Sequence, residues 1–184
     1  MGTLAKIDLS SYRCNVYVET GTGQALSLGR AIPIFQECFS VDLEQDFLEL
    51  AHQKFPSANL FRGLSTEALE FWLSSGQIKD SDRVLFFLDA HFPGSDFHGV
   101  PYSMDDPNAV PLKEELEIIK KYRPNGNDYI ICDDLRIFIE GPFEYGDATF
   151  HVPGGLDFLY DIYDKSKITL DYRETGYIFI DNRK

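Results

Sequence analysis

Apolar and polar positions follow two alternating patterns along this chain. Short runs rich in apolar residues predict five strands, at 15–19, 38–42, 59–61, 83–89 and 129–133. The fourth run is apolar through its middle, as a strand covered on both faces must be. Stretches with apolar residues at helical spacing separate these runs. This alternation predicts a parallel sheet with helices on both faces.

The predicted helices are marked by their start and stop residues. Pro56 stops the second helix, Gly76 ends the third, and Pro111 occupies the favoured first position of the fourth. Ser65 can cap the third helix. The predicted helices cover about 25–35, 43–55, 65–76, a stretch from 111 onward, and 156–163.

Two further apolar runs, 168–172 and 177–181, flank a short turn and predict an antiparallel hairpin. The fold class expected is therefore α/β. We expect a Rossmann-like three-layer sandwich, with a mostly parallel sheet and a C-terminal antiparallel hairpin, in a single domain over 1–184. Two long loops, 92–110 and 141–155, would form a pocket for an acceptor, and the first is expected to be mobile without ligand.

Composition narrows the function classes. The 184 residues carry 30 acids against 17 bases, a formal net charge of −13, with no basic cluster. Nucleic acid and anionic membrane surfaces are therefore excluded as expected partners. The chain shows no membrane-length apolar run and no signal-peptide pattern, so a cytoplasmic location is expected. Cys14, Cys38 and Cys132 fit no zinc or redox spacing and are expected to be buried, reduced thiols.

Four of the five predicted parallel strands end in carboxylates. In open α/β sheets, ligands bind outside the carboxyl ends of the strands, so these acids converge on the expected ligand crevice. They are Glu19, Asp42, Asp89 and the pair Asp133 and Asp134.

A glycine turn, Gly21-Thr-Gly23, follows the first of these acids. Asp42 comes about 20 residues after the turn, a spacing typical of an acid that binds the ribose hydroxyls of an adenosine. Asp42 could equally be a helix N-cap, with Gln45 completing a capping box. A glutamate beside the turn would repel a pyrophosphate but suits a cationic ligand. This charge favours S-adenosylmethionine over a dinucleotide.

The fourth and fifth strand ends gather three carboxylates, which repel one another unless a cation lies between them. Oxygen ligands suit Mg²⁺ or Mn²⁺. His91 could be a further ligand, a general base, or a hydrogen-bonded structural residue, and Asp134 could simply cap the following turn. The sequence thus predicts a divalent-metal site at Asp89, Asp133 and Asp134.

These motifs resemble the class I S-adenosylmethionine-dependent methyltransferases, and within them the macrocin-type O-methyltransferase branch. The likeness covers about residues 14–140. It is carried by VETGTG at 18–23, SVD at 40–42, LFFLDAHF at 85–92, PLKEEL at 111–116 and IICDDLR at 130–136. Where the family often shows Gly-Asp-Ser, this chain has Gly63-Leu64-Ser65.

The resemblance implies a role for each candidate. Glu19, Gly21 and Gly23 would flank the methionine part of the donor, Asp42 would hold its ribose, and Ser65 would join the donor site. Asp89, Asp133 and Asp134 would hold the metal. Apart from the resemblance, the chemistry at the strand ends makes His91, as a general base, and Asp89 the candidate catalytic residues. The expected reaction is metal-assisted O-methylation of a small hydroxylated acceptor.

Two other functions fit the same residues. A metal-dependent hydrolase or phosphoesterase could use the Asp-x-His motif and the acid pair, although it lacks further histidines. A non-catalytic binding domain could share the fold, because fold does not fix function. The sequence contains no signal for an oligomeric state.

Overall fold

The computed structural model describes residues 4–91 and 109–183. One mixed sheet runs through them in the strand order β3-β2-β1-β4-β5-β7-β6. Strands β1 to β5 are parallel, and β7 is antiparallel to both β5 and β6. The strands are β1 Val16–Thr20, β2 Glu37–Asp42, β3 Asn59–Arg62, β4 Val84–Leu88, β5 Tyr129–Cys132, β6 Ile168–Asp171 and β7 Tyr177–Asp181.

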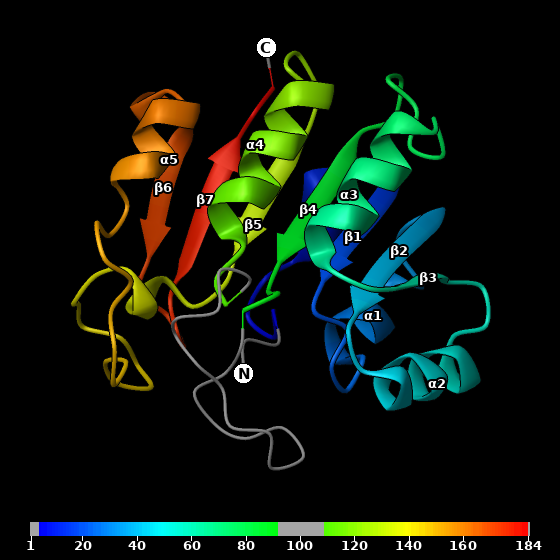
Figure 1. Cartoon of the computed structure of the whole chain (residues 1–184), viewed down its shortest axis with the longest axis horizontal. Coiled ribbons are helices and arrows are strands. Elements are labelled where there is room, and N and C mark those ends of the chain that lie inside the picture. Colours follow the sequence, from blue (N-terminus) through cyan, green and yellow to red (C-terminus); the bar gives the residue numbers. More distant parts are fainter. Residues whose placement is uncertain (1–3, 92–108, 184) are drawn as a thin grey trace.

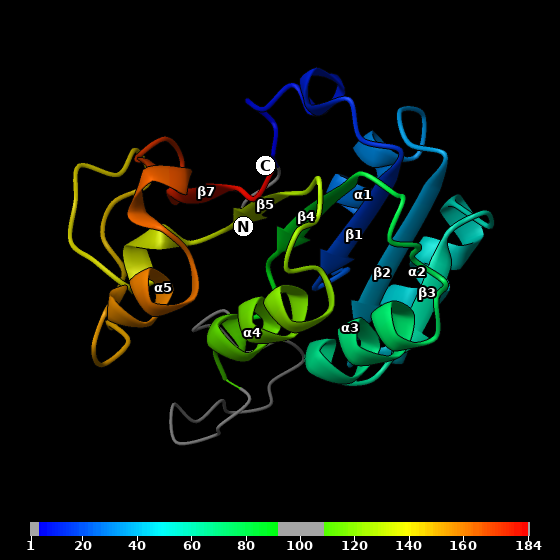
Figure 2. The same cartoon turned by 90° about the horizontal axis from the view of Figure 1, so that it is seen from above.

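Helices cover both faces of this sheet. Figure 1 shows α3, α4 and α5 on the near face, and Figure 2 separates this layer from the sheet and from α1 on the far face. The Rossmann-like three-layer sandwich is therefore confirmed, including its C-terminal antiparallel strands. The helices are α1 Leu26–Ala31, α2 Gln45–Lys54, α3 Ser65–Ser74, α4 Leu112–Tyr122 and α5 Asp157–Ile162.

Alternating side chains of the central strands fill two hydrophobic cores. In β1, Val18 packs into the core that contains Trp72 of α3 and Leu116 of α4. Its neighbour Tyr17 packs into the opposite core with Leu28 of α1. Strands β1 and β4 are buried along their whole length, as expected for strands covered on both faces.

The N-terminal segment completes the far face. Leu4, Ile7 and Leu9 are buried in the same core as Phe87 of β4 and Ile131 of β5. An irregular segment with one short 3-10 helix therefore covers this part of the sheet in place of a regular helix.

The predicted elements are present, with shifted ends. Helix α1 starts only at Leu26 because Ala25 adopts a left-handed conformation (φ 58°), and Pro33 lacks the N–H needed to extend it. The cysteines are free thiols, with Cys38 and Cys132 buried and Cys14 half-buried.

The structure bears only partly on two expectations, the mobility of the loop 92–110 and the cytoplasmic location. The loop expected to be mobile, 92–110, lies almost wholly outside the described residues. Within the described ranges, no helix combines the length and apolar character needed to cross a bilayer. The cytoplasmic location stays a prediction.

Candidate functional site

The glycine turn lies at the carboxyl end of β1. Gly21 (φ +83°) and Gly23 (φ +47°) both adopt left-handed conformations that glycine tolerates best. A Cβ at Gly21 would lie 2.6 Å from the carbonyl oxygen of Asp89, so only glycine lets the turn pack against the end of β4. A Cβ at Gly23 would meet nothing within 4 Å. The backbone at Gly23 is therefore open to a ligand.

Asp42 ties the end of β2 to this turn. Its Oδ2 accepts a hydrogen bond from the Gly23 N–H at 2.9 Å, and its Oδ1 accepts one from the Glu44 N–H at 2.9 Å. The predicted capping box is wrong, because Glu44 is the N-cap of α2 and the Gln45 side chain donates to Glu49 instead. Each carboxylate oxygen can accept a second hydrogen bond, so the ribose-binding role stays a prediction.

Glu19 lies behind the turn and is fully buried. Its carboxylate accepts hydrogen bonds from Tyr17, Ser27 and Ser40, at 3.0, 2.7 and 2.7 Å. Burial raises the pKa of Glu19 to about 7, and these hydroxyls partly oppose the rise. The Ser40 hydroxyl also lies 2.6 Å from that of Thr22 in the turn. The structure thus places Glu19 as a support for the turn from within the core.

His91 lies between two of the predicted metal ligands. Its Nε2 is 2.5 Å from Oδ2 of Asp134, and its Nδ1 is 3.5 Å from Oδ1 of Asp89. Burial works against a charged imidazole, but the hydrogen bond to Asp134 and the nearby carboxylates outweigh it and raise the pKa of His91. These contacts therefore favour the charged imidazolium at this strand end. The general-base role predicted for His91 stays a prediction.

The acids around His91 differ in their pKa. Burial raises the pKa of Asp89 well above its ordinary value, with the charges of Asp133 and Asp134 adding to the rise. Burial and the Asp134 charge raise the pKa of Asp133 to about 6. Burial also opposes the charged form of Asp134, yet its pKa is lowered because His91 and Arg136 both pair with it.

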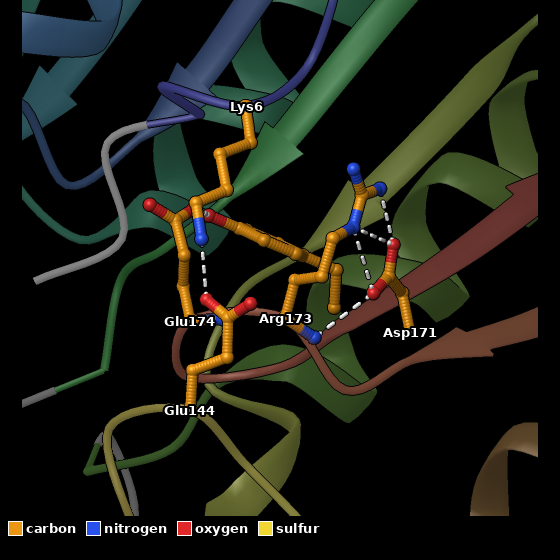
Figure 3. Close-up of polar contacts among 6 residues, drawn as sticks. Lys6, Glu144, Asp171, Arg173 and Glu174 are labelled. Carbon is orange, nitrogen blue, oxygen red and sulfur yellow. Dashed lines mark hydrogen bonds and ion pairs between the residues drawn. The ribbon is translucent and has the colours of Figure 1, made fainter.

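The turn between β6 and β7 supports Asp133. Thr175 of this turn donates a hydrogen bond of 2.9 Å to Oδ1 of Asp133. Figure 3 shows how the turn is held: Glu144 binds Lys6 of the N-terminal segment and lies beside Glu174, whose N–H donates to it at 3.1 Å. Segments from both ends of the described chain therefore fix the partner of Asp133.

These pairings occupy several of the carboxylate oxygens that a shared metal ion would need. One oxygen of Asp134 binds His91 and the other binds Arg136, while Asp133 binds Thr175. Among the residues that the structure describes, no group of three or more His, Cys, Asp or Glu side chains is placed to hold a metal. The arrangement does not support the divalent-metal site predicted at Asp89, Asp133 and Asp134.

Glu115 is a site residue that the sequence reasoning missed. It lies in the first turn of α4, is 1% exposed, and has a pKa raised to about 7 by burial. The hydroxyls of Ser65 and Thr20 partly oppose this rise as hydrogen-bond partners. A signal was available, because position 115 falls on the apolar face defined by Leu112 and Ile119.

Ser65 is not the cap of α3. Leu64 is the N-cap residue and Ser65 is the first helical residue, 7% exposed, with its hydroxyl directed to Glu115. Its role in donor binding stays a prediction.

The aromatic residues in the two loops expected to form the acceptor pocket have different surroundings. Phe143 packs against Tyr172 with ring centres 5.3 Å apart, and Phe150 packs against the main core. Tyr145 is exposed. Phe92, Phe97 and Tyr102 lie outside the described residues.

Comparison with known proteins supports the fold. No family model matches the chain, and no curated protein sequence is significantly similar to it. Among solved structures, a SAM-dependent methyltransferase from Archaeoglobus fulgidus aligns with a TM-score of 0.52 and 18% identity, over 91% of this chain and 68% of that one. An rRNA methylase from Streptococcus thermophilus aligns with a TM-score of 0.52 and 11% identity, over 92% and 87%. At these identities the likeness shows a methyltransferase-type fold.

Proposed function

We propose that this chain is a S-adenosylmethionine-dependent methyltransferase that acts on a small-molecule acceptor. The observation that carries the proposal is the link between Asp42 and the Gly23 N–H, at the carboxyl ends of β2 and β1. In an open α/β sheet a ligand binds at this edge, and an acid after the second strand can hold a ribose. The fold shared with the two methyltransferases described above adds support.

The residues present fit the donor. The backbone at Gly23 is open, Gly21 lets the turn approach β4, and the carboxylate of Asp42 keeps free acceptor capacity. The donor supplies an electrophilic methyl group when bound. In this arrangement Gly21, Gly23 and Asp42 bind and orient it, while Glu19 holds the turn in shape from behind.

The acceptor belongs on the other half of the crevice, at the ends of β4 and β5. His91 lies there with Asp89 and Asp134, and it can hold a proton at Nε2 or Nδ1 between these two carboxylates. The proposal leaves out metal-assisted O-methylation, because both oxygens of Asp134 and one oxygen of Asp133 already pair with protein groups. The hydrolase alternative depends on the same ion and is not favoured.

Calorimetry with S-adenosylhomocysteine tests the proposal. The Kd of Asp42→Ala and that of the better-matched Asp42→Asn should be about 10- to 100-fold higher than the Kd of the wild type. This is the effect expected from the loss of a charged hydrogen-bond partner. Asp46→Ala removes an exposed acid from the first turn of α2 and should leave the Kd unchanged.

The other outcomes are equally informative. No binding by the folded wild type would remove the proposed function. Wild-type affinity in both Asp42 variants would remove the ribose-binding role alone. If the protein binds the donor but does not convert S-adenosylmethionine to S-adenosylhomocysteine with any of a panel of small acceptors, a non-catalytic binding domain is favoured.

A further inference from the structure

A small cavity lies beneath the start of α4, between the ends of β4 and β5. It has room for a group about the size of one water molecule. Its walls are mostly apolar, from Leu88, Leu112 and Phe138, with three polar side chains among them. The polar members are His91, Glu115 and Asp133.

Two carboxylate oxygens of this cavity lack partners. Oε1 of Glu115 and Oδ2 of Asp133 are buried and accept no hydrogen bond from any residue that the structure describes. Glu115 is 1% exposed and Asp133 is 2% exposed. A buried acceptor without a donor is costly, so natural structures rarely leave one without a water, an ion or a ligand.

Other buried acids of this chain show the contrast. Asp128 is enclosed by Arg123, which donates to both of its oxygens at 2.8 Å. Glu19 accepts three hydroxyl donors. Of the three buried side-chain atoms without a partner in the described ranges, two are carboxylate oxygens, and the residues that carry them line this one cavity.

The charge of the cavity indicates what would complete it. Neither a lysine nor an arginine is among its described lining residues, and His91 already pairs with Asp134. A water molecule could donate hydrogen bonds in this cavity, but it would bring no positive charge to the two acidic side chains. An ammonium group has the required size, three donors and the opposite charge.

We propose that this cavity binds the ammonium group of the methyl acceptor, which is therefore a small primary amine. This inference rests on the proposed function, because it names the substrate class of the same enzyme. The cavity residues come from β4, β5 and α4, whereas the donor residues lie at β1 and β2. Gly21 packs against the carbonyl of Asp89, so the two half-sites adjoin.

Amide NMR titration with methylammonium chloride tests the cavity. The wild type should show saturable shifts at the amides of Glu115 and Asp133. Glu115→Gln should weaken this binding at least tenfold, because it removes the charge and keeps the side-chain shape. Glu114→Gln is the matched control, since Glu114 is the exposed acid next to it in the same helical turn.

Two control compounds, one salt and one neutral solvent, complete the test. Sodium chloride at the same ionic strength and methanol at the same concentration should not reproduce the shifts. Equal shifts with either one, or wild-type binding by Glu115→Gln, would overturn the proposal. The amide spectrum of each variant reports whether it is folded, and Asp133→Asn provides a second variant with the same expected loss.

Donor binding separates this inference from the proposed function. Glu115→Gln should bind S-adenosylhomocysteine as tightly as the wild type, and an equal loss would assign the cavity to the donor and overturn the amine site. If the wild type binds S-adenosylhomocysteine but not methylammonium, the amine site is wrong and the proposed function is unaffected. If it binds methylammonium but not S-adenosylhomocysteine, the proposed function fails and the cation site remains.

Discussion

Two buried glutamates divide the candidate site into unlike halves. Glu19, on the proposed donor side, and Glu115, on the proposed acceptor side, are both enclosed, and burial raises the pKa of each to about 7. Three hydroxyl groups donate to Glu19. Glu115 keeps one oxygen without a partner among the described residues.

The pair shows that burial and a raised pKa do not distinguish a structural acid from a binding one. A carboxylate whose oxygens are occupied by its own fold stabilises that fold and has little left for a ligand. A buried carboxylate with an oxygen that lacks a hydrogen-bond donor destabilises the fold, so a ligand that supplies the donor gains binding free energy there. Substitutions of Glu19, of Glu115 and of their hydrogen-bond partners test this difference.

The largest effect is expected for Glu19→Ala. This variant leaves the hydroxyls of Tyr17, Ser27 and Ser40 without their acceptor, and the free energy of unfolding should fall by about 4 kcal/mol. Chemical denaturation measures the change. Glu37→Ala removes an exposed glutamate from β2 and should cost less than about 0.5 kcal/mol. Equal losses in the two variants would contradict the structural role of Glu19.

The second effect is a pH dependence due to Glu115. Its pKa rises from 4.5 in the unfolded chain to about 7 in the folded one, so the folded state holds the proton more tightly. The free energy of unfolding should therefore fall as pH increases from 4.5 to about 7, by up to about 3 kcal/mol.

Glu115→Gln should remove that part of the fall and leave the part due to Glu19. Denaturation at several pH values compares it with the wild type and with Glu114→Gln, which should follow the wild type. The nearby charges of His91 and Asp133 are the same in all three proteins. Parallel curves for Glu115→Gln and the wild type would show that the carboxylate of Glu115 is not buried as described.

A smaller effect is expected when Glu19 loses only one donor. Ser27→Ala should lower the free energy of unfolding by about 1 kcal/mol and raise the pKa of Glu19 further, because the Ser27 hydroxyl stabilises the charged form. Ser74→Ala, on the exposed end of α3, serves as the control and should change stability by a few tenths of a kcal/mol. No difference between these serine variants would weaken the comparison.

The smallest effect concerns metal. Millimolar Mg²⁺ or Mn²⁺, or removal of metal by EDTA, should shift the Tm by less than about 1 °C, because an ion that finds no ligand set adds no binding energy to the folded state. Thermal unfolding measures this in the wild type and in Asp133→Asn. A rise of several degrees that disappears in Asp133→Asn would restore the metal site.

The fold could be predicted from the sequence because it depends on local patterns. The apolar run of β4 and the proline and glycine residues at helix ends fix which segments are strands and helices. The carboxyl-end rule then places Asp42, Asp89 and Asp133 at one edge of the sheet without any knowledge of side-chain contacts.

The pairing of those acids could not be predicted in the same way. His91 meets Asp134, and Thr175 meets Asp133 from more than 40 residues away. Such contacts depend on rotamers and on the turn between β6 and β7. The burial of Glu115 was not predicted for a different reason. A charged helix residue is usually exposed to solvent, although the spacing of Glu115 from Leu112 and Ile119 indicated the apolar face.

The position of β7 also sets the order in which a newly translated chain can finish folding. Because β7 lies between β5 and β6, the earlier-made β6 has no place in the sheet until residues 177–181 have left the ribosome. Until then β5 presents an open edge to any other extended chain, and Thr175 has not reached Asp133. A ribosome stalled before this strand would therefore display the proposed acceptor half-site unfinished, beside an unpaired sheet edge that is prone to aggregation.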